Sequence, residues 1–150
     1  MATMRREFLV VEEPTLLSSV IEIVVGVLRA DVTEAWVDAF TGGHREPEQR
    51  ADVAALLALE AQQIERGERR RQTGMGIDLD LARDDHLELL ARLAPFTIHA
   101  EAWAGREPVF SVSDAGDHAW FALTSDQQRQ SAQRLSEHGL VFDDVLVPRS

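Results

Sequence analysis

The chain has 150 residues, a length that fits one globular domain, and 26 acidic against 15 basic residues give it a formal net charge of −11. This charge repels phosphate backbones and anionic lipids, so nucleic acid and membranes are excluded as main partners, whereas a basic protein is favoured. The sequence contains no Lys, Asn, Tyr or Cys, which excludes lysine Schiff bases, Cys or Tyr nucleophiles and Cys-ligated zinc, and indicates the GC-rich genome of a bacterium or its phage.

The N-terminal segment is predicted to form a strand followed by a helix. The apolar run Phe8-Leu9-Val10-Val11 is closed by acids, which indicates a short strand over 7–12. It lacks the long apolar region and cleavage site of a signal peptide, so a cytoplasmic location is expected. Pro14 can open a helix that continues to Leu28 with apolar residues at helical spacing, although the β-branched residues leave a strand over 20–28 open.

Two further helices are predicted in the next part of the chain. The first begins at Asp31, where Glu34 completes a capping box, and it places Trp36 in the core and ends at Gly42-Gly43. The second has Pro47 at its first position and runs toward residue 66 with its apolar residues on one side.

An arginine-rich segment follows this helix. Arg66, Arg69, Arg70 and Arg71 gather where a helix C-terminus favours cations, and glycines come directly after them. This pattern is typical of a solvated helix end and a flexible linker over 66–76 within a single domain. The alternative is a docking point for an acidic or phosphate-bearing group.

Residues 77–81 alternate between apolar and acidic side chains, which predicts a strand with Asp78 and Asp80 on one face. Two carboxylates on one strand can bridge a divalent metal ion. The pattern resembles the acid-hydrophobe-acid element of nucleotidyltransferase-like enzymes, but the Gly42-Gly43 pair that would match their upstream turn lies a long helix away. The alternative is that both carboxylates are solvated strand residues.

The region 96–123 carries the strongest strand pattern in the chain. Apolar and polar residues alternate over 96–103, 108–113 and 118–123, and two four-residue turns separate these segments. Such a pattern predicts three antiparallel strands joined as a meander.

A well-marked helix follows the meander. Thr124 with Gln127, or Ser125 with Gln128, supplies its N-terminal cap, and Gly139 supplies a C-terminal stop. Residues 145–147 can add an edge strand. The expected fold is therefore α+β, an antiparallel sheet with a C-terminal three-strand meander, about 96–123, packed against several helices.

Alternation also divides the meander into two faces. The core face is expected to hold Phe96, Ile98, Ala100, Ala102, Phe110, Val112, Ala119, Phe121 and Leu123. The other face is expected to hold Thr97, His99, Glu101, Trp103, Ser111, Ser113, His118 and Trp120. Aromatic anchors beside hydrogen-bonding groups are typical of protein interfaces, so Trp103, Trp120, His99, Glu101 and His118 are candidate partner-binding residues. The alternative is that both indoles lie under a helix or form a cross-strand packing pair.

The same residues are the chain's candidates for a metal site. His99, Glu101 and His118 would supply two imidazoles and a carboxylate, and Asp78 with Asp80 is the second candidate. The His-x-Glu spacing matches zinc deaminases, but the cysteines that those enzymes require are absent. No Gly-x-Ser-x-Gly elbow and no nucleotide-binding glycine motif after a strand occurs, so no catalytic residue and no cofactor is assigned.

These features together favour a small acidic protein-binding module of the immunity, antitoxin or adaptor type over an enzyme. Its expected partner is a protein, with a basic surface, and a homo-oligomer remains open. One alternative is a metal-dependent hydrolase or transferase that uses the histidines and carboxylates named above. Another is a structural subunit of a phage or injection machine, which would assemble with itself.

Overall fold

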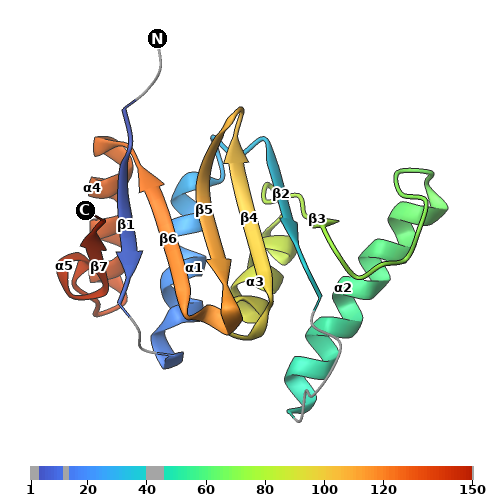
Figure 1. The fold of residues 1–150 in the computed structure, drawn as a ribbon. Helices are drawn as coiled ribbons and strands as arrows, with labels where there is room; N and C mark the ends of the chain where they lie inside the picture. Colours follow the sequence, from blue (N-terminus) through green and yellow to red (C-terminus); the bar gives the residue numbers. More distant parts are fainter. Residues whose placement is uncertain (1–3, 12–13, 40–45, 150) are drawn as a thin grey trace.

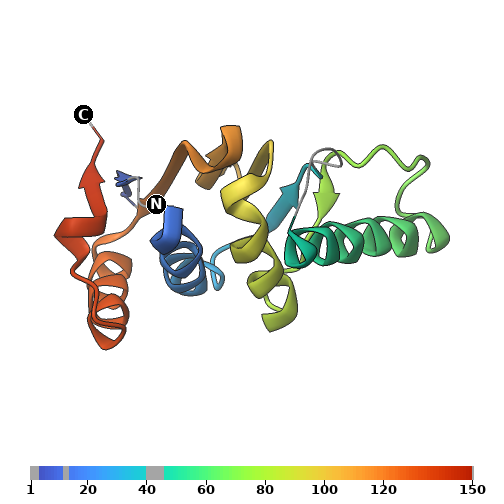
Figure 2. The same ribbon diagram turned by 90° about the horizontal axis from the view of Figure 1, so that it is seen from below.

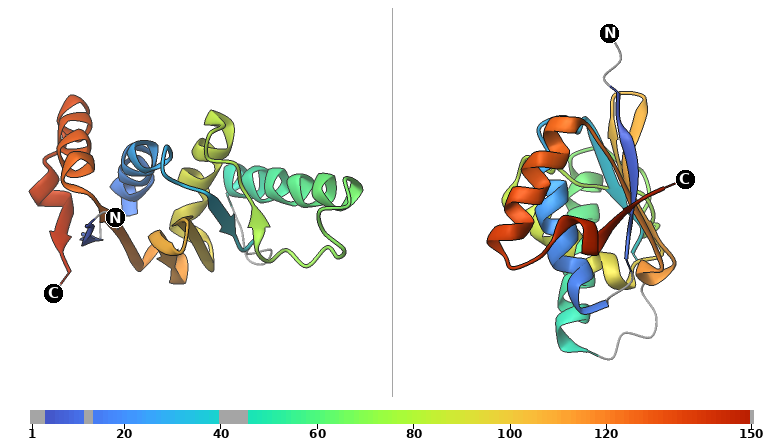
Figure 3. Two further views of the ribbon diagram at one scale, coloured as in Figure 1. Left: turned by 90° about the horizontal axis from the view of Figure 1, so that it is seen from above. Right: turned by 90° about the vertical axis from the view of Figure 1, so that its left-hand side faces the viewer.

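The computed structural model of the chain describes residues 4–11, 14–39 and 46–149, and it confirms the predicted α+β fold. Seven strands form one antiparallel sheet in the order β3-β2-β4-β5-β6-β1-β7 (Figure 1). Helices α1, α3 and α4 pack on one face of this sheet, and none of the described helices covers the opposite face (Figure 3). Helix α2 packs against α3 and β3 at one edge (Figure 2).

The strands are β1 Arg6–Val10, β2 Glu34–Val37, β3 Ile77–Asp78, β4 His99–Ala104, β5 Glu107–Ser113, β6 His118–Leu123 and β7 Leu146–Pro148. The α-helices are α1 Pro14–Leu28, α2 Pro47–Glu65, α3 Asp84–Leu93, α4 Ser125–Glu137 and α5 Phe142–Val145. Two 3-10 turns, Ala94–Phe96 and Asp114–Gly116, flank the β4-β5 hairpin. No described helix combines the length and the apolar character needed to cross a membrane.

The best-marked predictions are confirmed because their signals are local. Strands β4, β5 and β6 form the predicted meander. Thr124 caps α4, accepting a hydrogen bond from the Gln127 N–H at 3.2 Å while its own N–H donates to the Gln127 side chain. At the other end, the Leu140 N–H donates to the Leu135 carbonyl past Gly139, which has a φ of 75°.

The predicted helix from Asp31 is wrong, because Glu34–Val37 forms strand β2. Ala35 and Val37 are buried against the helices, whereas Trp36 is half-buried on the opposite face rather than in the core. The spacing of these residues fits both a helix and a strand, and pairing with β4 decides the outcome. Gly42-Gly43, the predicted helix end, lies outside the described residues.

The face assignment of the meander is correct within the strands and wrong before β4. Thr97 is 2% exposed, because its hydroxyl donates to the Asp38 carbonyl instead of facing solvent. Ile98 is 44% exposed, and Phe96 belongs to a 3-10 turn. Pro95 sits inside that turn, so the alternation begins only at His99.

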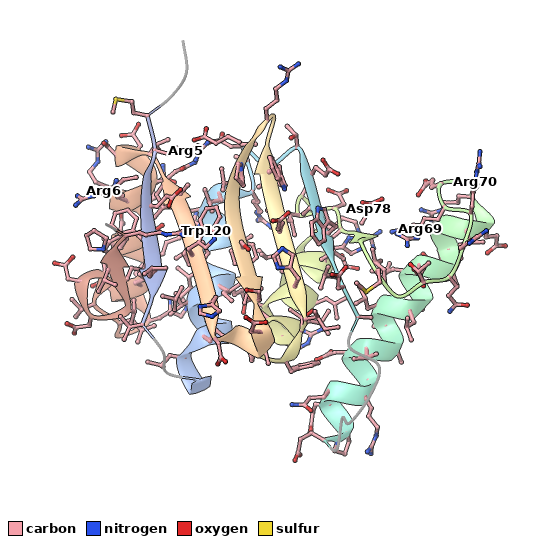
Figure 4. All side chains as sticks on the ribbon, in the orientation of Figure 1. Arg5, Arg6, Arg69, Arg70, Asp78 and Trp120 are labelled. Atoms are coloured by element: carbon pink, nitrogen blue, oxygen red, sulfur yellow. The ribbon has the colours of Figure 1, made fainter. Side chains whose placement is uncertain are left out.

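A buried ion pair anchors the segment 66–76 that the sequence presents as a candidate flexible linker. The Glu60 side chain of α2 is fully buried and accepts hydrogen bonds from the Gly74 and Thr73 N–H groups at 3.1 and 3.3 Å. Arg69 lies 3.0 Å from this carboxylate and also donates to the Gly76 carbonyl at 2.7 Å. One of the four clustered arginines thus has a structural role (Figure 4).

Both edges of the sheet are protected against further strands. At the β7 edge, the pairing register turns the backbone groups of Leu146 and Pro148 outward. The Leu146 N–H is already used, donating to the Phe142 carbonyl, and proline has no N–H to offer. At the β3 edge, Gln63 of α2 donates to the Asp78 carbonyl at 2.9 Å. The sheet therefore presents its uncovered face, rather than an edge, to other molecules.

Candidate functional site

The uncovered surface of the sheet, called the open face below, carries side chains from all seven strands. It comprises Glu7, Leu9, Glu34, Trp36, Asp78, His99, Glu101, Trp103, Ser111, Ser113, His118, Trp120, Val147 and Arg149. One row of cross-strand partners runs Asp78, Trp36, Glu101, Ser111, Trp120, Leu9, Val147. Figure 4 shows Trp120 on β6 and Asp78 at the β3 edge. All three tryptophans of the chain therefore share the surface that no described helix covers.

Glu101 joins the first group of predicted residues. Its Oε1 lies 3.1 Å from His99 Nε2, and its Oε2 accepts a hydrogen bond from the Trp103 indole N–H at 3.2 Å. The Trp36 ring packs against the His99 ring with 5.3 Å between their centroids. Because Glu101 holds both His99 and Trp103, and Trp36 packs on the His99 ring, this group presents two indoles in an ordered arrangement that suits recognition.

Trp120 belongs to a second group on the other half of the open face. The Arg149 guanidinium lies 5.9 Å from its ring centroid, and Arg149 Nη1 lies 3.3 Å from Glu7 Oε2. Strand β5 separates Trp103 from Trp120, since Trp103 pairs with Pro108 and Trp120 with Ser111. The two indoles therefore form no cross-strand pair, and α1 lies on the opposite side of the sheet (Figure 3).

The histidines of the open face are not brought to one metal ion. His99 and His118 lie on strands to either side of Ser113, with which both are paired. His99 contacts Glu101, whereas His118 Nε2 lies 3.7 Å from Asp114 at an exposed corner. Among the described residues, no group of three or more His, Asp or Glu side chains is arranged to hold a metal ion.

Asp78 and Asp80 line a pocket of about 230 Å³ between α2, β3 and α3. Strand β3 ends at Asp78, and the Asp80 carboxylate accepts a hydrogen bond from the Ala82 N–H at 3.1 Å. The Asp80 N–H donates to His86 Nδ1 at 2.8 Å, so the neutral imidazole carries its hydrogen on Nε2 and has no free lone pair for a metal ion. Of the predicted carboxylate pair, Asp80 is thus held in a hydrogen-bonded turn, whereas the Asp78 side chain is exposed.

His86 is the titratable group in this pocket that the sequence patterns miss. It is 7% exposed, and no described atom makes a hydrogen bond with its Nε2. Burial lowers the pKa of His86, and the nearby Arg83 guanidinium lowers it further. The folded protein therefore keeps this imidazole neutral at pH values where an exposed histidine is protonated.

The protein is expected to lose stability as the pH falls below about 6.5, the ordinary pKa of histidine in an unfolded chain. Because folding lowers the pKa of His86, the unfolded chain binds a proton first, and protonation favours unfolding. Urea denaturation at pH 7.5 and 5.5 measures this loss. It should be smaller in His86→Gln, while His138→Gln, which changes an exposed histidine, should follow the wild type. Equal losses in wild type and His86→Gln would contradict the assignment.

The open face also carries Trp36, Glu34, Glu7 and Arg149, which are not among the predicted site residues. The sequence predicts a helix over Trp36 and Glu34, and only the alternation over 34–39 indicates their true face. Glu7 and Arg149 meet across the β1-β7 pair, which joins segments at opposite ends of the chain. No local pattern indicates that contact.

Comparison of the chain with protein-family models, with curated proteins and with solved structures finds no match.

Proposed function

We propose that the chain is a protein-binding module whose open face docks a basic protein partner, as an immunity, antitoxin or adaptor protein would. The observation that carries the proposal is the position of Trp36, Trp103 and Trp120, all half-buried on the face without a described helix. Tryptophan is enriched among the residues that dominate binding energy at protein interfaces. Three large aromatic side chains on one uncovered sheet face are more than a solvated surface requires.

Charge on the open face favours a basic partner. Its strands place four carboxylates on it, those of Glu7, Glu34, Asp78 and Glu101, and its described cation is the Arg149 guanidinium. The whole chain carries a net charge of −11, which accelerates its encounter with a positively charged surface and disfavours self-association.

The dimensions of the open face fit a protein interface. Seven strands at a spacing of about 4.8 Å make the face roughly 30 Å wide, and five-residue strands make it roughly 17 Å long. A typical stable complex buries about 800 Å² on each partner, so the face, at roughly 500 Å² from these dimensions, would form the larger part of such an interface and its rim the rest. The protected edges leave face docking as the favoured mode, rather than strand addition.

Replacing Trp103 and Trp120 together by alanine is expected to lower the affinity for the partner by about 100-fold or more while the fold survives. Both side chains are half-buried on the open face, so their removal leaves the core between sheet and helices intact. Affinity capture from the native host with wild-type and variant protein identifies a partner that depends on the two indoles. Calorimetry with that purified partner then measures the affinity.

The control variant is Val141→Ala, which removes an apolar side chain that is 59% exposed and lies outside the open face. It should bind the partner as the wild type does. The proposal fails if the double alanine variant binds the partner unchanged, or if the double alanine variant unfolds.

A further inference from the structure

The open face already binds one guanidinium, that of the chain's own Arg149. Arg149 extends over the Trp120 ring, with 5.9 Å between its Cζ and the ring centroid, and pairs with Glu7 at 3.3 Å. An indole from one strand and a carboxylate from the next thus receive one arginine. The planar guanidinium suits this setting because it can stack on an aromatic ring and hydrogen-bond to a carboxylate at the same time.

The other half of the open face repeats these elements around Trp36 in greater number. Asp78 of β3 and Glu101 of β4 are its cross-strand partners on either side. Glu34 is its same-face neighbour within β2, and the buried Asp38, just past the end of β2, continues the alternation because its N–H still donates to the His99 carbonyl. All four positions next to this indole are therefore carboxylates.

Two of these carboxylates are free to bind a cation. The other two already have partners: Asp38 accepts a hydrogen bond from the Gly76 N–H at 2.6 Å, and Glu101 contacts His99 and accepts a hydrogen bond from Trp103. The side chains of Glu34 and Asp78 are exposed, and neither contacts a basic group or a hydrogen-bond donor of the described chain. The Trp36 half thus has the indole and the acids of the Trp120 half without an arginine.

We propose that the Trp36 half of the open face binds an arginine side chain of the partner, with the guanidinium stacked on Trp36 and paired with Asp78 and Glu34. This inference rests on the proposed function, since it names the partner group that the face receives. Arginine fits better than lysine because its flat fork can meet a ring face and two carboxylates together, whereas an ammonium is a hydrated point charge.

Binding of acetylated tetra-arginine amide tests the proposal directly. In ¹⁵N spectra, the indole N–H signal of Trp36 should shift saturably with this peptide. Tetra-lysine amide should bind about fivefold or more weakly, and the uncharged tetra-citrulline amide should cause no shift. Equal affinities for the arginine and lysine peptides, or shifts confined to Trp120, would overturn the proposal.

Charge-neutral variants separate this site from bulk attraction. The double variant Glu34→Gln/Asp78→Asn should bind tetra-arginine about tenfold more weakly, because it removes both free carboxylates without changing shape. The control Asp143→Asn/Asp144→Asn removes two exposed charges outside the open face and should weaken binding much less. If both double variants bind tetra-arginine equally weakly, the net charge of the chain alone explains the binding, and the proposed site is overturned.

Arg149→Gln provides a test in the opposite direction. Removing the chain's own guanidinium should free the Trp120 half, so the Trp120 indole signal should join that of Trp36 in shifting with tetra-arginine. No new shift would contradict the use of Arg149 as a template. A partner that requires Trp103 and Trp120 but binds Glu34→Gln/Asp78→Asn unchanged would overturn the arginine site and leave the proposed function standing.

Discussion

Replacing Glu60 by alanine is expected to lower the free energy of unfolding by about 3–5 kcal/mol. The carboxylate is fully buried on α2, and Arg69 beside it is 16% exposed in its side chain, so the variant leaves a buried guanidinium without its counter-charge. It also leaves the buried Gly74 N–H without an acceptor. Together these losses should release the segment 66–76 from the helix.

Urea denaturation followed by circular dichroism measures this loss, and amide hydrogen exchange shows whether protection disappears over 66–76. Glu60→Gln should lose less, because its amide oxygen still accepts a hydrogen bond from the backbone while the ion pair is gone. Glu65→Ala, which changes an exposed residue on the same helix, should stay within about 0.5 kcal/mol of the wild type. If Glu60→Ala is as stable as Glu65→Ala, the ion pair does not anchor the segment.

Two adjacent residues, Phe121 and Trp120, should give opposite results when each is changed to alanine. Phe121 is fully buried and its ring stacks on Phe110 with 5.3 Å between centroids, so Phe121→Ala should cost about 3–5 kcal/mol of stability. Trp120 faces away from the helices, so Trp120→Ala should cost about 1 kcal/mol. On the proposed function, the same change should weaken partner binding by about 30-fold.

Measuring both quantities for both variants makes the comparison sharp. Phe121→Ala, studied in conditions where it remains folded, should bind the partner within about threefold of the wild type, because its side chain lies beneath the sheet. The assignment of faces is wrong if Trp120→Ala proves the less stable variant. The binding role of Trp120 is wrong if its affinity equals that of Phe121→Ala.

Much of the fold could be predicted because the patterns that specify it involve residues close together in the sequence. Pro14 and Pro47 mark helix starts, and the capping box at Thr124 marks another. The meander alternates over three consecutive segments with turns between them, so strand order and face follow from neighbours in the sequence. The edge strand near Val147 is likewise found where its apolar residues predict one.

The misassigned segment around Trp36 lacked such a local signal. Its apolar residues satisfy a helical and an extended pattern equally, and Asp31 with Glu34 imitates a capping box. The strand forms because β4, some 60 residues further along, offers it a pairing edge. A preference decided by a distant partner is not visible in a short window of sequence.

The candidate site was predicted in part for the same reason. His99, Glu101 and Trp103 come from one strand, so alternation alone places them together. Trp36 joins them only through the β2-β4 pair, and Arg149 reaches Trp120 only because β1 lies between β6 and β7. Alternation correctly predicts Trp103 and Trp120 on one face of the sheet, but the strand order, which no residue pattern reveals, decides that the two indoles stand apart.

The position of β1 between β6 and β7 has a consequence for the nascent chain. Phe8 pairs with Phe121, so about 110 residues must be synthesised before β1 finds its first neighbour in the sheet. At translation rates of about 5–20 residues per second, its apolar run waits roughly 5 to 25 s without a strand to pair with. The hairpin of β4 and β5 can form earlier, from residues close together in the sequence. Chaperone dependence during synthesis should therefore centre on residues 6–11, at the opposite end of the chain from the strands that complete the fold.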